Sequence, residues 1–345
     1  MSISEKLEIF LITYNRAKKL ENTLNQIFAE NSPVKNFDIT VIDNNSTDST
    51  REVVFKFQAL NSNLKYEKNK YNIGGNANIV KAFYKAKKEY VWVLADNDDL
   101  CWDSWNEVEN FIQEGSDAIV VATYECPKYD IAQLFDQMTF LPGVIYKTSN
   151  IDDTVIGNME FNISNMFPHL ALASKIINEK RKISIVSNAI VLVRSNCDEN
   201  GEYIFTRGYN RDSIHPLQKG MNWLSGYANS LYLIKDLKIR NYIISHNRFC
   251  TELNSAKLFF LLKKQPDQNL YNYLCIFAVL SVIDKLKFIM NFILCNSLFK
   301  IIYINKREIL DVNAGLLIRQ FHLWIFSFIK IKMFQIKKDI KGVCR

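Results

Sequence analysis

Short apolar runs alternate with segments of helical period over the first 125 residues of the chain. Five runs have the length and composition of buried strands: residues 7–13, 37–43, 64–67, 90–94 and 118–123. Four intervening segments repeat apolar residues at helical spacing: residues 16–30, 50–60, 76–87 and 104–113. Alternation of this kind predicts right-handed crossovers and a mainly parallel sheet, which places the chain in the α/β class.

The pattern changes along the rest of the 345-residue chain. Residues 125–209 read as mixed α/β, and the sequence after Tyr227 becomes helical and apolar without a low-complexity linker. We therefore expect an α/β domain over residues 1–230, made of halves 1–125 and 126–230. A mostly helical region over residues 231–345 should follow it.

Polar residues follow each of the first four predicted strands at the point where the apolar run ends. These loops are residues 13–16, 43–46, 72–75 and 96–99. In open α/β sheets, ligands bind beyond the carboxyl ends of the strands. The fold would therefore bring all four polar loops to one edge of the sheet.

The last of these loops places three carboxylates together, at Asp96, Asp98 and Asp99, directly after a buried apolar run. Such oxygen-rich clusters suit hard divalent cations such as Mg²⁺ or Mn²⁺, although Asp and Asn are also common turn residues. The position of the cluster, as the fourth of four polar strand-end loops, favours the metal. We expect Asp98 to bind it beside a diphosphate, where a cation stabilises a departing nucleoside diphosphate.

The other loops carry weaker signals that have ordinary structural alternatives. Asp43 follows a strand and could accept hydrogen bonds from a base or a ribose, or could serve a turn. After Asn72, Gly74 and Gly75 permit close backbone approach ahead of a helix start, which suits phosphate, or they could form a plain turn. Arg16 could neutralise phosphate or could be solvated.

Four motifs occur in order and at fitting intervals. They are Thr-Tyr-Asn-Arg at 13–16, Val-Ile-Asp-Asn-Asn-Ser-Thr-Asp-Ser-Thr at 41–50, Asn-Ile-Gly-Gly at 72–75 and Leu-Ala-Asp-Asn-Asp-Asp at 94–99. Together they closely resemble the nucleotide-binding half of glycosyltransferase family 2, which has the GT-A fold. The resemblance covers residues 7–125 well and extends more loosely to residue 230.

The resemblance implies an inverting transferase that uses a nucleotide-diphosphate sugar and a Mg²⁺ or Mn²⁺ ion. In that family the residue matching Asp43 contacts the nucleobase. The first Asp of the Asp-x-Asp motif, here Asp96, lies near the ribose, and the second, here Asp98, binds the metal on the diphosphate. The positions matching Thr13, Tyr14 and Arg16 line the nucleotide pocket.

The sequence departs from the family where a Glu-Asp pair usually supplies the general base. Met-Phe-Pro-His-Leu at 166–170 stands there and looks like a variant found in some bacterial surface-polysaccharide transferases. Pro168 suits the first turn of a helix, and His169 could take the acceptor hydroxyl proton because imidazole titrates near neutral pH. The alternative for His169 is a core or capping role, and catalysis is slightly favoured. Glu160, Asp152 and Asp153 are the alternative bases.

The net charge of +7 is concentrated at the C-terminus. Residues 319–345 hold seven basic residues and one acidic residue, interleaved with large apolar side chains. This mixture predicts either a helix on an anionic membrane surface or a terminal helix packed on the core. So many large apolar groups argue against nucleic-acid binding.

The remaining composition favours a cytoplasmic protein, peripheral at most on the inner face of the cell membrane. The seven cysteines form no Cys-x-x-Cys pair, which argues against zinc and disulfide frameworks. The first apolar run is short and follows Glu5 and Glu8, so no signal peptide is predicted. The best candidate for a membrane span, residues 273–294, contains three charged residues, so no span is predicted.

Three functions are compatible with these features. The first is a transferase that adds one sugar to a saccharide or lipid-linked acceptor, since no Gln-x-x-Arg-Trp motif of processive relatives is present. The second is a non-catalytic nucleotide-sugar-binding module that has lost its base. The third is a sugar-1-phosphate nucleotidyltransferase, which is disfavoured because the loop at 13–16 has no glycine.

Overall fold

The computed structural model of the chain describes residues 2–122, 130–163, 166–192 and 226–246, together with 282 and 285. The chain divides into two compact units, Met1–Asn247 and Arg248–Arg345. The basic tail at 319–345 and most of the expected helical region lie outside the described residues. The predicted boundary after residue 230 therefore stays a prediction.

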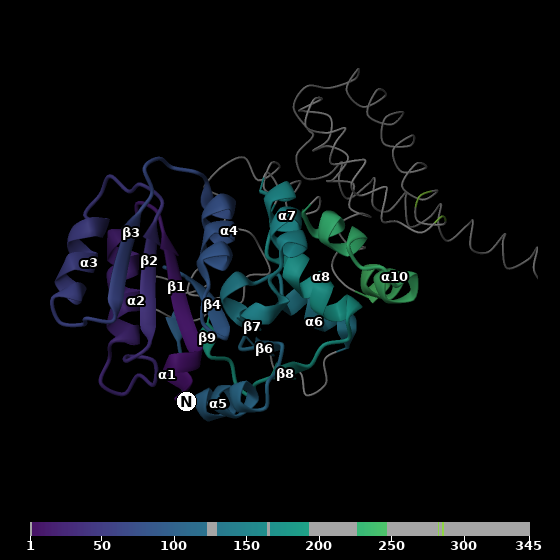
Figure 1. The fold of residues 1–345 in the computed structure, drawn as a ribbon, viewed down its shortest axis with the longest axis horizontal. Coiled ribbons are helices and arrows are strands. Elements are labelled where there is room, and N and C mark those ends of the chain that lie inside the picture. Colours follow the sequence, from purple (N-terminus) through teal and green to yellow (C-terminus); the bar gives the residue numbers. More distant parts are fainter. Residues whose placement is uncertain are drawn as a thin grey trace, which may run out of the picture. The chain divides into compact units, whose positions relative to one another are not determined.

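The first unit is built on a seven-stranded sheet with the strand order β3-β2-β1-β4-β7-β6-β8 (Figure 1). The strands are β1 (Leu7–Thr13), β2 (Asp38–Asp43), β3 (Leu64–Lys68), β4 (Tyr90–Ala95), β6 (Ala118–Val120), β7 (Val144–Lys147) and β8 (Ile183–Ile185). A separate antiparallel pair joins β5 (Asp99–Leu100) to β9 (Val191–Leu192).

The helices connect and cover these strands. They are α1 (Ile3–Lys6), α2 (Ala17–Ile27), α3 (Thr50–Gln58), α4 (Gly75–Lys85), α5 (Trp105–Gln113), α6 (Ile131–Gln137), α7 (Asp153–Phe161), α8 (Leu170–Asn178) and α10 (Leu237–His246), with a further helix over residues 226–232. Two 3₁₀ turns, η1 (Leu141–Gly143) and η2 (Thr148–Asn150), flank β7.

The predicted α/β class and mainly parallel sheet are confirmed. The pairs β1–β2, β1–β4, β2–β3 and β6–β8 are parallel, whereas β7 runs antiparallel to both of its neighbours. The insertion of β7 between β4 and β6 was not predicted, because sequence order gives no hint that a later strand separates them. None of the helices in the described part is long and apolar enough to cross a membrane.

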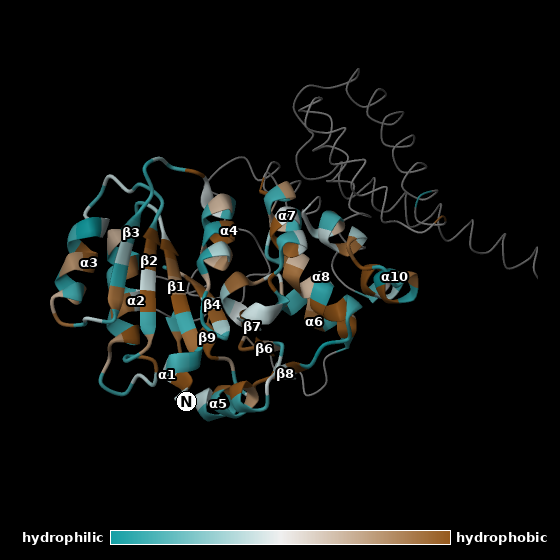
Figure 2. Ribbon diagram, viewed as in Figure 1, coloured by the Kyte–Doolittle hydropathy of each residue, from teal (hydrophilic) through white to brown (hydrophobic). Residues whose placement is uncertain are grey.

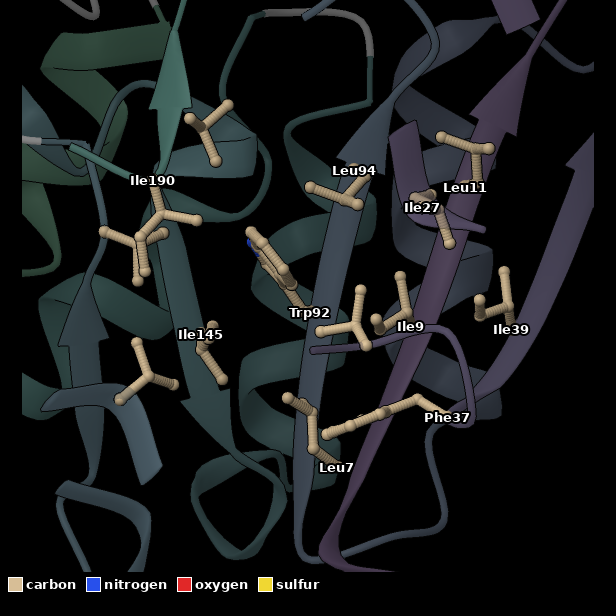
Figure 3. Packing of buried hydrophobic residues seen from close by; sticks show 14 of the residues in the cluster. Leu7, Ile9, Leu11, Ile27, Phe37, Ile39, Trp92, Leu94, Ile145 and Ile190 are labelled. Carbon is tan, nitrogen blue, oxygen red and sulfur yellow. The ribbon is translucent and has the colours of Figure 1, made fainter. Parts of the chain in front are cut away.

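One face of the sheet is closed by α2, α3 and α5 through a continuous apolar cluster (Figure 3). Alternate strand residues such as Leu7, Ile9 and Leu11 enter it, because successive side chains of a strand point to opposite faces. Trp92 is fully buried at its centre, stacks on Trp105 of α5 at 6.0 Å, and donates its indole N–H to the Pro142 carbonyl at 2.7 Å. This packing fixes β4 rigidly beneath its terminal loop.

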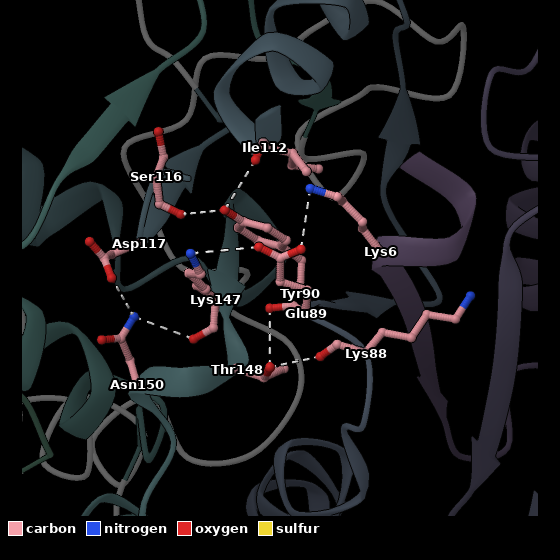
Figure 4. A network of polar contacts seen from close by, with 10 residues as sticks. All are labelled: Lys6, Lys88, Glu89, Tyr90, Ile112, Ser116, Asp117, Lys147, Thr148 and Asn150. Carbon is pink, nitrogen blue, oxygen red and sulfur yellow. Dashed lines mark hydrogen bonds and ion pairs between the residues drawn. The ribbon is translucent and has the colours of Figure 1, made fainter. Parts of the chain in front are cut away.

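The two ends of the sheet differ in their chemistry. At the amino end of β4, the buried Tyr90 hydroxyl donates to the Ser116 carbonyl at 2.9 Å, and Thr148 donates to the Lys88 carbonyl at 2.7 Å (Figure 4). These bonds tie the start of β4 to the segments that directly follow α5 and β7. At the opposite, carboxyl end, the loops after β1, β2 and β3 carry mostly hydrophilic residues (Figure 2).

Candidate functional site

The carboxyl ends of four neighbouring strands lie level at one edge of the sheet. Thr13 is paired with Asp43 across β1 and β2, Asp43 with Lys68 across β2 and β3, and Ile12 with Ala95 across β1 and β4. The loops that follow these strands therefore meet. They carry all the residues expected to bind a ligand except His169.

Asp96, directly after β4, is held by the first loop. Its carboxylate is 1% exposed, with Oδ2 accepting from the Thr13 hydroxyl at 2.7 Å and Oδ1 accepting from the Arg16 guanidinium at 3.0 Å. Arg16 keeps half of its side chain in solvent and also lies 3.4 Å from the Asn97 side-chain oxygen. The site therefore contains its own cation, paired with a buried carboxylate and accessible from outside.

Asp98 is 3% exposed in the turn between β4 and β5. Among the residues that the structure describes, no group of three His, Cys, Asp or Glu side chains is arranged to hold a metal. Mg²⁺ is commonly bound by one or two protein carboxylates and completes its shell with phosphate and water. Both oxygens of Asp96 already accept hydrogen bonds, and the assignment of the metal to Asp98 stays a prediction.

Asp43, the last residue of β2, is completely buried. Its Oδ1 accepts two hydrogen bonds from Ser46, from the backbone N–H at 2.8 Å and from the hydroxyl at 2.5 Å, and its Oδ2 accepts one from the Tyr66 phenol at 2.6 Å. Burial of the phenol, together with its hydrogen bond to Asp43, raises the pKa of Tyr66. Tyr66 therefore stays protonated and acts as a donor.

The first two loops are braced against each other. Asn15 adopts the left-handed conformation (φ 50°), which asparagine tolerates better than most residues. Its backbone N–H donates to the Ser46 hydroxyl at 2.8 Å, and its side-chain oxygen accepts from the Thr47 N–H at 2.8 Å. Asp48 accepts from the N–H of Ala17, the first residue of α2, at 2.9 Å. The loop geometry is thus set before any ligand arrives.

A ladder of asparagine amides links the second loop to the start of α4. The Asn44 amide donates to the Asn72 oxygen at 2.8 Å, while the Asn44 oxygen accepts from the Ile73 N–H at 2.9 Å and from Asn69 at 3.0 Å. Asn69 in turn donates to Asn78, whose amide donates to the Ile42 carbonyl at 3.1 Å. Backbone partners at both ends fix the orientation of these amides.

The two glycines of the third loop stand at the start of α4. Gly74 has a φ of +85°, a conformation open to glycine, and its N–H donates to the Asn72 side-chain oxygen at 2.9 Å. A Cβ at Gly74 or at Gly75 would meet no atom within 4 Å. The helix N-terminus therefore has open space beside it. Tyr14 of the first loop is also 42% exposed.

His169 belongs to none of these four loops and stands at the N-cap of α8. It is 2% exposed, and its Nε2 lies 3.1 Å from the Met138 carbonyl and 3.2 Å from the Thr139 carbonyl, so Nε2 carries the proton. Desolvation by burial lowers its pKa to about 4, despite those hydrogen bonds. Its Nδ1 is buried without a hydrogen-bond partner in the part of the chain described. The imidazole is therefore neutral at neutral pH, with one free lone pair.

The segment around His169 is under conformational constraint. Phe167 has a φ of 67°, which is unusual for a bulky residue, and its ring meets the His169 ring edge-on at 6.2 Å. A Cβ at Gly226 would lie 2.0 Å from the Met166 carbonyl oxygen, so the helix over residues 226–232 approaches this backbone as closely as glycine allows. The close contact and the unusual φ together fix the position of His169.

The alternative bases lie on α7 and are exposed. Asp152 caps this helix by accepting from the Val155 N–H at 2.9 Å, and it pairs with Lys175 of α8 at 2.6 Å. Asp153 and Glu160 are exposed at the two ends of the helix. The general base stays a prediction.

Sequence reasoning did not single out Tyr66, Asn69 or Asn78. The sequence signal for them was slight: Asn69 follows a strand directly, and Asn78 is a polar residue on the buried face of α4. A buried amide requires hydrogen-bond partners, and those partners lie on other elements.

The fold first defines the class: an α/β protein with a polar site beyond the carboxyl ends of its parallel strands. Comparison of sequences then gives the family. The profile of Glycosyl transferase family 2 matches residues 8–180, half of the chain. The chain belongs to this family, so the relationship expected from the four motifs is confirmed.

Curated relatives match part of the chain. Abequosyltransferase RfbV of Salmonella typhimurium is 25% identical over 173 residues, 49% of this chain and 51% of the relative. A β-1,3-glucosyltransferase of Campylobacter jejuni, named for a GalNAc(5)-diNAcBac-PP-undecaprenol substrate, is 35% identical over 96 residues, 28% of this chain and 30% of the relative. The chain therefore matches about half or less of the length of these relatives.

Solved structures that the comparison matches to this chain include TarS of Staphylococcus aureus and a mannosyltransferase of Pyrobaculum calidifontis. TarS is 16% identical with a TM-score of 0.49, covering 79% of this chain and 82% of TarS. The mannosyltransferase, solved with GDP-Man and Mn²⁺, is 13% identical with a TM-score of 0.49, covering 86% of this chain and 87% of the other.

Proposed function

We propose that this protein is a metal-dependent, inverting glycosyltransferase. It moves one sugar from a nucleotide-diphosphate sugar to a saccharide or lipid-linked acceptor in bacterial surface glycan synthesis. The observation that carries the proposal is the meeting of four polar loops at the carboxyl edge of the sheet in a member of glycosyl transferase family 2. The names of the Salmonella and Campylobacter relatives support the surface-glycan role.

Each loop has a task in donor binding under this proposal. Asp43 faces the base, and Thr13 and Asp96 lie on the ribose side. Gly74 and Gly75 offer a helix N-terminus, which favours phosphate. Asp98 would hold Mg²⁺ or Mn²⁺, which when bound stabilises the departing diphosphate. The pre-braced loops position the donor, so little reorganisation accompanies the reaction.

The transfer is a single displacement. The acceptor oxygen forms a bond to the anomeric carbon, the bond from that carbon to the diphosphate oxygen breaks, and the hydroxyl proton passes to a base. His169 is the proposed base, since its neutral imidazole has an unprotonated Nδ1. The burial of that nitrogen favours a second candidate function, a nucleotide-sugar-binding module without turnover.

The decisive experiment incubates the full chain with UDP-, dTDP-, GDP- and CDP-sugars and Mn²⁺ and measures release of the nucleoside diphosphate. We expect release from one donor class, its loss with chelator, and its recovery on adding excess Mn²⁺. Donor binding without any release, even with lipid-linked acceptors, would favour the binding module. A protein that binds none of the donors would contradict both functions.

Replacing Arg16 with glutamine should weaken donor binding. Its half-exposed guanidinium lies beside the buried Asp96 carboxylate and can also reach an anionic ligand. Loss of a charge-assisted hydrogen bond predicts a rise of about 10-fold in the donor KM, with a much smaller change in kcat. Lys18→Gln, which removes an exposed cation two residues further on, in the first turn of α2, is the matched control. Equal effects of the two variants would indicate only a loss of general positive charge.

The last part of the proposal concerns the C-terminal tail and where in the cell the protein acts. We propose that the basic, aromatic tail at residues 319–345 binds the anionic inner face of the cell membrane, which would bring the protein to lipid-linked acceptors. Sedimentation with anionic and with neutral vesicles tests this. The intact chain should bind only the anionic vesicles, and the chain without this tail neither kind.

A further inference from the structure

The loop between β3 and α4 presents large apolar side chains to solvent at the carboxyl edge of the sheet. Tyr71 is 65% exposed and Ile73 is 43% exposed. Phe161, the last residue of α7, is 67% exposed at the same edge, because the Asn76 amide near the start of α4 donates to the Ile163 carbonyl at 3.0 Å (Figure 1). One exposed apolar residue is ordinary, whereas several at one place are typical of an interaction surface.

The backbone of this loop is anchored at both ends. The Asn69 N–H, directly after β3, donates to the Asp43 carbonyl at 2.8 Å. The Ile73 N–H donates to the Asn44 side-chain oxygen at 2.9 Å, and the Asn69 amide donates to the same oxygen at 3.0 Å. The fold therefore leaves Tyr71 and Ile73 exposed on a loop whose backbone position is already set.

Two lysines accompany the apolar side chains in the loop. Lys68 and Lys70 are both exposed, and the Lys70 ammonium lies 5.4 Å from the centre of the Tyr71 ring. Lys68 donates to the Ser46 carbonyl at 2.6 Å. Neither lysine takes part in the ion pairs that form among the described residues. The loop therefore carries two positive charges that no carboxylate of the described chain pairs with.

We propose that the β3–α4 loop, residues 68–73, is a surface by which the first unit contacts an anionic membrane. The inference rests on the proposed function, because a lipid-linked acceptor would reach the site from such a membrane. Lysines attract anionic head groups. Tyrosine favours the boundary between water and lipid, and an aliphatic side chain favours the hydrocarbon just beneath it. Lysines, tyrosine and isoleucine in one short loop suit a charged lipid surface better than a neutral sugar, which offers the lysines no opposite charge.

The position of the loop gives this contact its role. Gly74 and Gly75, beside which the proposed function places the donor diphosphate, follow Ile73 directly. A membrane against residues 68–73 would therefore hold the carboxyl edge of the sheet close to the lipid head groups. Two lysines and two apolar side chains are too few for stable attachment, since even a single acyl chain gives only marginal binding. The loop therefore orients the first unit on a membrane to which the proposed tail contact attaches the protein.

Quenching by brominated lipids tests where the first unit meets the membrane. Tryptophan replaces Ile73 or, as the matched control, Leu60, an 83% exposed apolar residue just before β3 at the opposite edge. The full chain is mixed with vesicles of brominated phosphatidylglycerol, and the wild-type signal is subtracted. The fluorescence added by Ile73→Trp should be quenched, whereas that added by Leu60→Trp should persist. Equal quenching at the two positions, or quenching at neither, would overturn the proposal.

The affinity of the full chain for phosphatidylglycerol vesicles tests the charge. Lys70→Gln should weaken binding about 5-fold, the equivalent of about 1 kcal/mol for one lysine near an anionic surface. Lys87→Gln is the matched control and should change it much less, since Lys87 is an exposed cation between α4 and β4 at the opposite edge. Equal losses in both variants would overturn the proposal, because net charge alone would then explain binding. Vesicle binding needs no donor, so its failure would leave the transferase standing, and lack of turnover with an intact vesicle contact would overturn the transferase alone.

Discussion

Replacing Asp98 with asparagine is expected to lower nucleoside diphosphate release at least about 100-fold, because stabilisation of a developing charge at a site of this kind is worth several kcal/mol. Asparagine keeps the volume of the side chain and removes the charge that a hard cation requires. Asp98 is nearly buried in the turn after β4, and both oxygens of its neighbour Asp96 already accept hydrogen bonds. Asp96 therefore cannot replace it without releasing Thr13 or Arg16.

The measurement pairs turnover with a direct readout of metal binding. Titration of Mn²⁺ by electron paramagnetic resonance, with the nucleotide present, should show weaker binding in Asp98→Asn, while circular dichroism shows an unchanged fold. Asp103→Asn is the matched control, since Asp103 is an exposed carboxylate shortly after the same turn. Undiminished turnover and Mn²⁺ affinity in Asp98→Asn would remove this residue from the metal assignment.

The elements that hold the site could be predicted because their signals are local. The runs that became β1, β2, β3 and β4 and the helices α2 to α5 were each expected within a few residues of their bounds. Period and composition act over one element at a time. The convergence of four strand-end loops then followed from topology alone, since parallel strands place their carboxyl ends at one edge.

The partners within the site could not be predicted, since they depend on distances in space. Thr13 and Asp96 are 83 residues apart, and their contact at 2.7 Å exists because β1 and β4 are neighbours. Tyr66 reaches Asp43 from an adjacent strand for the same reason. The strand-end residues expected to bind the ligand do lie at one edge of the sheet. The hydrogen bonds that orient them could not be predicted from the sequence and are visible only in the structure.

The burial of His169 determines its protonation state, which the Met-Phe-Pro-His-Leu motif at 166–170 alone does not reveal. The sequence placed it at a helix start and left it open whether it served catalysis or the core. The structure encloses it between the carbonyls of α6's C-terminal turn and the constrained segment at 166–168. Its environment disfavours the charged imidazolium, and this property can be measured without knowing the substrate.

His169 should make the first unit lose stability as the pH falls from about 6.5 towards about 4. Burial lowers the folded-state pKa of His169 to about 4, below its ordinary value of 6.5. Between these two pH values the imidazole is therefore protonated in the unfolded chain and neutral in the folded one. The stabilisation is therefore complete above the unfolded pKa and disappears as the pH falls through the folded one. Between about pH 7 and about pH 4.5, this linkage amounts to about 2 kcal/mol.

The test compares urea unfolding of the wild type and His169→Gln at both pH values, followed by the fluorescence of the buried Trp92 and Trp105. Glutamine can donate to the same carbonyls and does not titrate, so the variant should lose about 2 kcal/mol less stability than the wild type on acidification. Other titrating groups contribute equally to both proteins and cancel in the difference. Above about pH 7 the two stability curves should run parallel, since His169 is neutral in both states there. Curves that run parallel down to about pH 4.5 would show that the imidazole is protonated as easily in the folded chain as in the unfolded one, and would leave His169 with a pKa suited to accepting a proton near neutral pH.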